Sequence, residues 1–243
     1  MANINQEISA QLQGKSLPVS SSWLNTFVAS TSHQRNVPLA ALTQTAVFRV
    51  LASDFRDSLT TSSPSSLLPA DISHPTIQER RIQGPIPVQV LDVEDIGSSL
   101  WSQVEAIERV ERGEAIRGRE IVRTVNVGED RGEGVDGANG TAAGSNELGN
   151  SNGPHRLIVQ DAKGTKAVAL ELRQVHGIGT GKLAIGAKLL LRNTTVARGM
   201  VLLTPECVTI LGGKIDALDQ SWRDGRKERL LARITAAAGE QTQ

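Results

Sequence analysis

The spacing of the apolar residues changes once along this 243-residue chain, and that change limits the fold more than any other feature. Through residue 60 the apolar side chains recur at every third or fourth position, whereas from residue 82 they recur at every second position. The first period is that of an amphipathic helix and the second that of a half-buried strand. We therefore expect an α+β protein in which a helical part precedes a β part.

The helical part, residues 1–60, divides into three short segments, each with one apolar stripe. The stripes consist of Ile4, Ile8 and Leu12; of Trp23, Leu24, Phe27 and Val28; and of Leu39, Leu42, Ala46, Val47 and Val50. Ser20, Ser21 and Ser22 are candidates to cap the second segment, and Pro38 is placed to open the third. Because each stripe has to be buried, we expect a three-helix bundle. Residues 61–81, which begin with a Ser- and Pro-rich stretch, are predicted to be a linker.

The β part, residues 82–213, contains five apolar segments. They lie near residues 86–93, 157–159, 168–172, 189–196 and 200–211. The apolar parity changes between Val90 and Leu91, which predicts a β-bulge that bends the strand. The pairs Asp161–Gly164 and Arg198–Gly199 mark predicted hairpin turns. Five such strands suit a five-stranded OB-type β-barrel. Residues 214–243 are predicted to add a C-terminal helix, weakened in its middle by Gly225.

A long insertion, residues 98–155, separates the first two predicted strands. Its start has the pattern of an amphipathic helix, with one apolar stripe formed by Leu100, Trp101, Val104 and Ile107. Residues 127–153 hold eight Gly and four Asn in 27 positions. We expect that run to be disordered, because it has too few apolar side chains to offset the entropy of ordering. Trp101 is the only aromatic residue between Phe55 and Trp222. This favours contact with a partner, and the alternative is that it packs against its own barrel.

The residue types that carry catalysis or bind metals are sparse and scattered. Cys207 is the only cysteine, which excludes an internal disulfide and any zinc site with several cysteines. The four histidines lie far apart in the sequence, without metal-ligand spacing. The run Gly14-Lys15-Ser16 matches the end of a P-loop, but Ser9 stands where its first glycine is required. We find no catalytic constellation, so we expect no enzyme, no metal and no cofactor.

No membrane association is expected from the sequence. No apolar run approaches the ~18 residues that a membrane-spanning helix needs. The N-terminus has neither the basic start nor the apolar stretch of a secretion signal.

Charge is segregated although the net charge is zero. Residues 76–153 carry eight basic and fourteen acidic side chains, and residues 154–243 carry fourteen basic and eight acidic ones. The basic part either attracts a polyanion or an acidic protein surface, or is an ordinary solvated surface. Its candidate contacts in the barrel are Lys163, Lys166, Arg173, Lys182, Lys188, Arg192 and Arg198.

Aromatic residues are missing from the predicted strands. Residues 82–97 and 156–213 contain no Phe, Tyr or Trp, so bases have no rings on which to stack. Direct binding of DNA by the barrel should therefore be weak and steeply dependent on salt. We expect a protein-docking module, with a free-standing single-stranded-DNA-binding protein as the alternative.

Several stretches of the barrel and its tail resemble one known family. They are LIVQDAKG (157–164), GAKLLLRNTTVARGMVLLTPECVTILGGKIDAL (186–218) and KERLLARI (227–234), with DIGSSLWSQVEAI (95–107) at the start of the insertion. The chain is similar in these stretches to the RecQ-mediated genome instability protein 1 family. The length resembles the compact fungal form, which lacks the second OB domain of animal members. The resemblance does not extend to the glycine- and asparagine-rich run.

The resemblance implies a non-enzymatic role in the nucleus, in DNA repair, recombination and replication. In this family the OB barrel docks on topoisomerase III, which works together with a RecQ-family helicase. The insertion reaches the DNA gate of the topoisomerase and modulates its opening during decatenation and double-Holliday-junction dissolution. Leu100, Trp101, Val104 and Ile107 are then the expected partner contacts. Whether the N-terminal helices pack on the barrel or serve the helicase stays open.

Overall fold

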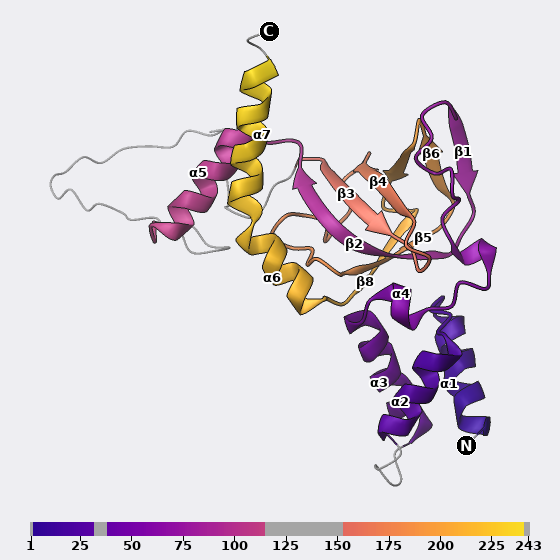
Figure 1. Ribbon diagram of the computed structural model, residues 1–243. Helices are drawn as coiled ribbons and strands as arrows, with labels where there is room; N and C mark the ends of the chain where they lie inside the picture. Colours follow the sequence, from indigo (N-terminus) through magenta and orange to yellow (C-terminus); the bar gives the residue numbers. More distant parts are fainter. Residues whose placement is uncertain (1, 32–37, 115–152, 241–243) are drawn as a thin grey trace, which may run out of the picture.

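The computed structural model describes residues 2–31, 38–114 and 153–240 of the chain. A helical domain lies at one end of a curled sheet, and the C-terminal helices extend from another side of that sheet (Figure 1). The run 127–153, predicted to be disordered, lies outside the described residues except for Gly153. Among the helices of the described part, none is long and apolar enough to span a bilayer.

Four helices of the helical domain lie in the part of the chain that the structure describes. They are α1 (Ala2–Gly14), α2 (Ser21–Thr31), α3 (Leu39–Ala52) and the single turn α4 (Phe55–Ser58). Of the three serines that were candidates to cap α2, Ser20 does so, since its hydroxyl accepts the Trp23 N–H at 3.3 Å, and Pro38 directly precedes α3 as expected. The predicted bundle of three helices was incomplete, because the short helix α4 is a fourth. Asp54 caps α4 by accepting the Arg56 N–H at 2.9 Å. The shared core consists of Ile8, Leu12, Leu17, Val19, Leu24, Phe27, Ala46, Val50, Phe55 and Leu59.

The sheet has eight strands in the described residues. They are β1 (Glu79–Ile82), β2 (Ile86–Asp95), β3 (His155–Gln160), β4 (Lys166–Glu171), β5 (Lys188–Leu191), β6 (Thr194–Ala197), β7 (Met200–Leu203) and β8 (Val208–Gly212). Their order is β1-β6-β7-β4-β3-β2-β5-β8, with β4 and β7 parallel and the other neighbours antiparallel. The OB-type character of this part was predicted, whereas the count of five strands was wrong.

Two of the five predicted segments are each broken into a pair of strands. The first break comes at Asn193, which has a positive φ of 47° and separates β5 from β6. The second is the turn closed by the Cys207 N–H donating to the Thr204 carbonyl at 3.1 Å, which separates β7 from β8. The remaining strand, β1, pairs with β6 and has too short an apolar pattern to be recognised in the sequence.

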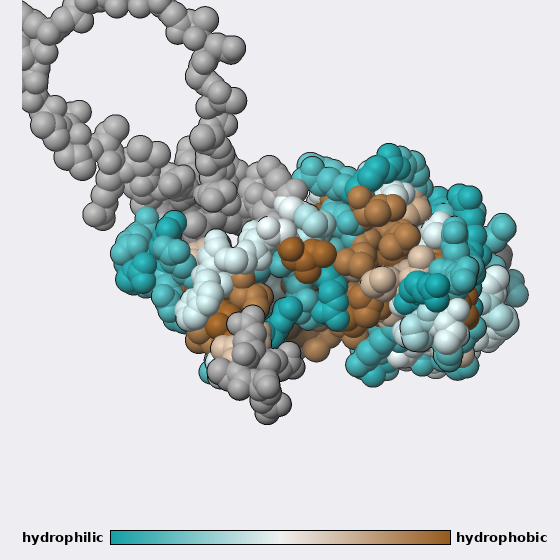
Figure 2. All heavy atoms as spheres, turned by 90° about the horizontal axis from the view of Figure 1, so that it is seen from above, coloured by the Kyte–Doolittle hydropathy of each residue, from teal (hydrophilic) through white to brown (hydrophobic). Residues whose placement is uncertain are grey.

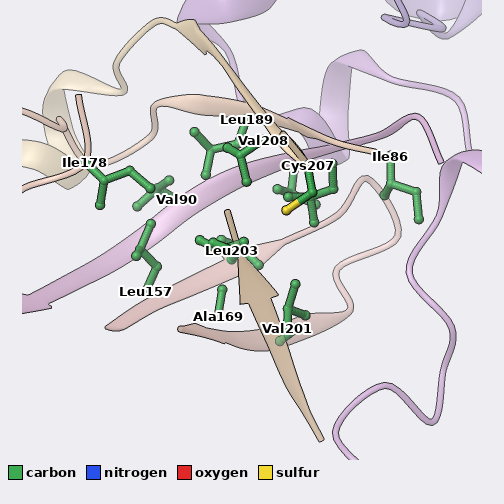
Figure 3. Close-up of a cluster of buried hydrophobic side chains, with 14 of the residues drawn as sticks. Ile86, Val90, Leu157, Ala169, Ile178, Leu189, Val201, Leu203, Cys207 and Val208 are labelled. Carbon is green, nitrogen blue, oxygen red and sulfur yellow. The ribbon is translucent and has the colours of Figure 1, made fainter. Parts of the chain in front are cut away.

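The long strand β2 bends so that the sheet curls around one core. The register with β3 shifts between Val90 and Asp92, which confirms the predicted bulge at the parity change. Because of that bend, β2 pairs with β5 over its first part and with β3 over its second. Side chains from most of the strands meet inside the curl, among them Val90, Leu157, Leu189, Val201 and Leu203 (Figure 3).

Part of the segment predicted as a linker belongs to the barrel. Residues 61–81 contain a short 3-10 helix, Pro64–Ser66, and most of β1. Leu68 and Ile72 are buried in the barrel core, and the Leu68 N–H donates to the Asp161 carboxylate at 2.9 Å. This segment therefore runs along the barrel and is held to it.

Two helices form the C-terminal part instead of the single one predicted. They are α6 (Asp216–Asp224) and α7 (Arg226–Glu240), and they separate at Gly225, the residue expected to weaken the helix. Trp222 of α6 packs against the barrel core, and its Nε1–H donates to the Asp92 carboxylate of β2 at 2.5 Å. The C-terminal helices are thus fixed to the strand from which the insertion leaves.

The helical domain packs directly on the barrel through a buried polar junction. Gln89 of β2 accepts the Phe55 N–H at 3.0 Å and donates to the Asp54 carboxylate at 2.9 Å. Lys188 of β5 is completely buried there, and its ammonium donates to the Gly186 carbonyl at 2.6 Å. Burial lowers the pKa of Lys188 to about 8, against a partly compensating attraction from Asp54. The barrel and the helical domain therefore pack against each other through one shared interface.

Candidate protein-docking site

The insertion leaves and re-enters the barrel through a narrow neck. The Ile96 N–H donates to the Pro154 carbonyl at 3.1 Å, and the Asp95 carboxylate accepts the Gly97 and Ser98 N–H groups at 2.8 and 3.1 Å. A Cβ atom on Gly97 would lie only 2.8 Å from the Cα of Gly153, so both positions need glycine for the two ends to approach. The neck therefore holds the base of the insertion in one place.

The predicted helix at the start of the insertion is α5 (Leu100–Glu111). Ser99 caps it by accepting the Ser102 N–H at 3.1 Å. Gln103 and Val104 are buried on its inner side, and the Gln103 amide donates to the Asp95 carbonyl at 3.0 Å. These contacts place α5 against the rest of the protein as an ordered element.

The four residues predicted to form one contact stripe face different environments. Val104 is only 3% exposed, and Leu100 and Ile107 are half-buried. Trp101, by contrast, leaves 63% of its surface exposed. Its alternative role, packing against its own barrel, was therefore wrong. A tryptophan left out of the core on an ordered helix is typical of a protein-interaction site, where tryptophan is enriched.

A second apolar surface lies on the outer face of the barrel, which we call the outer sheet face. It crosses β3, β4 and β7, because Ile158 pairs with Val168, and Val168 and Leu170 pair with Met200 and Leu202. These residues are half-buried, and Leu172 just beyond β4 is 64% exposed. Seen from above, hydrophobic atoms gather into a continuous area over the barrel (Figure 2). The outer sheet face consists of Ile158, Val168, Leu170, Leu172, Met200 and Leu202.

Sequence reasoning missed this surface, although the sequence contains a signal for it. In β4 the apolar alternation of Val168, Leu170 and Leu172 was recognised, but these residues point away from the core. The small residues Ala167 and Ala169 fill the interior instead. A strand that is apolar at both parities is typical of a sheet covered on both faces. Here only the inner face is covered by the described residues.

The predicted phosphate contacts are spread over several strands and connections of the barrel. Lys163, Lys166, Lys182, Arg192 and Arg198 are exposed, but they lie at strand ends and on separate connections. Arg173 is exposed and forms an ion pair with Glu206. Lys188 was predicted wrongly, because the helical domain covers it and its ammonium lies over the Phe55 ring.

Comparison with known proteins agrees with this arrangement of domains. The family model described as "RMI1, N-terminal helical domain" matches residues 11–58. The model described as "RMI1, N-terminal OB-fold domain" matches residues 68–226. The chain is also 25% identical over 222 residues to RecQ-mediated genome instability protein 1 of Schizosaccharomyces pombe, covering 90% of this chain and 92% of that protein. The resemblance noted in the sequence is thereby confirmed, and the chain belongs to the RecQ-mediated genome instability protein 1 family.

Proposed function

We propose that this protein is a non-catalytic accessory subunit of a nuclear complex of topoisomerase III and a RecQ-family helicase. In that complex its barrel docks on the topoisomerase, and its insertion modulates the DNA gate to promote decatenation and double-Holliday-junction dissolution. Family membership supports the genome-stability role, since the relative in Schizosaccharomyces pombe is named for RecQ-mediated genome instability. The observation that carries the proposal is the exposed Trp101 on the ordered helix α5.

The insertion can modulate the gate because its binding is coupled to the equilibrium between the open and closed states of the topoisomerase. A type IA topoisomerase opens a protein gate to pass a DNA strand, so its cycle contains open and closed states. A ligand shifts that equilibrium only by the difference between its affinities for the two states. Trp101 supplies a large apolar side chain for such a differential contact, and the neck at Gly97 and Gly153 holds its base on the barrel. The insertion therefore acts as a tethered ligand for one state of the gate.

We assign the docking of the barrel itself to the outer sheet face. Its aliphatic residues have no ring on which a base could stack, so they fit a protein surface better than a nucleic acid. Contiguous apolar surface on a monomer is a feature of protein-interaction sites. Exposed cations at its edge, Lys166 and Arg198, favour a partner whose matching rim is acidic. In this proposal both the outer sheet face and Trp101 of the insertion contribute to affinity for the topoisomerase, and the insertion alone acts on the gate.

Excision of the insertion separates these two roles. Because the Cα atoms of Gly97 and Gly153 nearly touch, residues 98–152 can be replaced by a short Gly-Ser linker without opening the barrel. We expect the barrel of the shortened protein to remain folded, and we expect the protein still to co-purify with topoisomerase III through the outer sheet face, with an affinity lowered by the loss of Trp101. We also expect it to lose the stimulation of decatenation. Full stimulation by the shortened protein would contradict the proposed role of the insertion.

The alternative function, a free-standing single-stranded-DNA-binding protein, has its own test. Titration of the isolated chain with oligonucleotides at two salt concentrations measures its intrinsic DNA affinity. We expect weak binding that falls steeply as salt rises, because the barrel strands offer surface cations but no aromatic rings on which bases could stack. Tight binding that survives raised salt would favour the alternative.

A further inference from the structure

The C-terminal helix α7 lies beside α5, although the two are far apart in the sequence (Figure 1). The Lys227 ammonium forms ion pairs with the carboxylates of Glu111 and Glu108 at 2.7 and 3.2 Å. One residue earlier, the Arg226 guanidinium donates to the Gln103 side-chain oxygen at 3.3 Å. The contacts therefore run along most of the length of α5.

Gln103 links three parts of the protein at one buried position. Its amide nitrogen donates to the carbonyls of Asp95 and Ser98 at 3.0 and 3.2 Å, which belong to the neck. Its oxygen accepts from Arg226 of α7. Rotation of α5 about the neck would break these bonds and leave buried polar groups without partners, which is costly. The side chain of Gln103 thus fixes the angle between the neck, α5 and α7.

The helix α7 is itself attached to the barrel and not only to α5. The Arg233 guanidinium donates to the Glu94 carboxylate of β2 at 2.9 Å. The guanidinium groups of Arg226 and Arg229 lie 5.4 and 5.8 Å from the centre of the Trp222 ring. Trp222 is hydrogen-bonded to Asp92 of β2, so continuous side-chain contacts connect the barrel to α7 and α7 to α5.

We propose that α7 is a strut that orients α5 and thereby aims Trp101 at the partner. This inference rests on the proposed function, because it concerns how the exposed side chain of α5 is presented. Arg226 and Lys227 are positioning residues: they hold α5 through Gln103, Glu108 and Glu111 and do not themselves contact the partner. A side chain held in its binding orientation costs less entropy on docking than one on a mobile helix. The helix α7, Arg226–Glu240, therefore matters for gate control by positioning α5.

The test is a charge reversal with a matched control and a rescue. Lys227→Glu places a third carboxylate beside Glu108 and Glu111, whereas Glu228→Lys reverses a charge at the next, exposed position of α7. The rescue combines Lys227→Glu with Glu108→Lys and Glu111→Lys. All proteins keep the full chain. Amide hydrogen exchange of α5 and stimulation of topoisomerase III in decatenation are measured on each.

We expect Lys227→Glu to speed exchange in α5 by roughly tenfold and to lower stimulation, with exchange in the barrel strands unchanged. The control should match the original protein, and the rescue should restore both readouts. Unchanged exchange in α5 would overturn the strut. Faster exchange with full stimulation would also overturn it, provided that Trp101→Ala lowers stimulation. If Trp101→Ala leaves stimulation intact, the proposed function is wrong. The exchange rates in α5 still show in that case whether α7 holds α5 in place.

Discussion

The ammonium of Lys188 lies 4.9 Å from the centre of the Phe55 ring, at the interface between the barrel and the helical domain. Its pKa of about 8, below the usual 10.5, reflects the loss of solvation in this buried position. Asp54 offsets that loss only in part. The junction therefore holds a buried cation whose charge is destabilising at neutral pH and is removed within an accessible pH range.

This burial predicts that stability rises with pH above neutrality. Below pH 8 both the folded and the unfolded chain hold the Lys188 proton, so the full penalty of the buried charge is present. Between about pH 8 and 10.5 the unfolded chain binds more protons than the folded one, so the free energy of unfolding increases. The total gain is about 3 kcal/mol for a shift of this size. Denaturant unfolding at a series of pH values measures it.

Lys188→Met provides the comparison. It keeps most of the length and apolar contacts of the side chain but removes the titrating group, so the curve of its stability against pH should be flatter than that of the original protein above pH 8. Equal slopes for the two proteins would mean that Lys188 does not hold a depressed pKa in the folded state.

Two adjacent glycines at the end of β8 offer a matched pair for testing the domain junction. Gly212 and Gly213 share a positive φ, at 82° and 85°. A Cβ on Gly212 meets nothing within 4 Å, whereas one on Gly213 would overlap the carbonyl group of Leu51 in α3. Gly212→Ala should cost only the ~1–2 kcal/mol of a left-handed alanine. Gly213→Ala should cost a further ~1–3 kcal/mol, because the helical domain has to move. Thermal unfolding that shows equal losses would contradict this interface.

The outer sheet face predicts a selective loss of partner binding. Leu170→Glu with Leu202→Glu places two charges at paired positions of β4 and β7, where both side chains point away from the core. We expect the variant to remain folded, as judged by circular dichroism, and to lose topoisomerase III in a pull-down. Thr209→Glu, an exposed position on β8, is the control that should retain binding. Retention of the partner by the double variant would exclude this face.

Much of the fold could be predicted because it depends on local periodicity. The helical stripes, the hairpin at Asp161 and the bulge near Leu91 are each specified by a few neighbouring residues. Strand breaks were harder to predict. The positive φ of Asn193 divides a run that looks like one apolar strand in the sequence. Asparagine adopts this left-handed conformation more readily than most residues, but its presence alone does not show that it does so.

The candidate docking site could not be predicted from the spacing of apolar residues, because it depends on which residues pack together in three dimensions. Alternation in β4 shows that one parity is apolar, but not that Ala167 and Ala169 fill the interior while Leu170 faces outward. Likewise, a lysine in a strand is normally a surface residue, and only the packing of Phe55 over Lys188 removes it from solvent. Both depend on contacts between residues distant in sequence.

The most direct test of the account is the affinity of topoisomerase III for Trp101→Ala, measured by titration with the full-length chains. Because Trp101 is 63% exposed, the variant should keep its melting temperature. Loss of an aromatic anchor should weaken binding by about 2 kcal/mol, or roughly thirtyfold. Phe48→Ala, which removes an equally exposed ring from α3, should bind normally. Unchanged affinity and unchanged stimulation of decatenation in Trp101→Ala would contradict the account, as would a lowered melting temperature with normal binding.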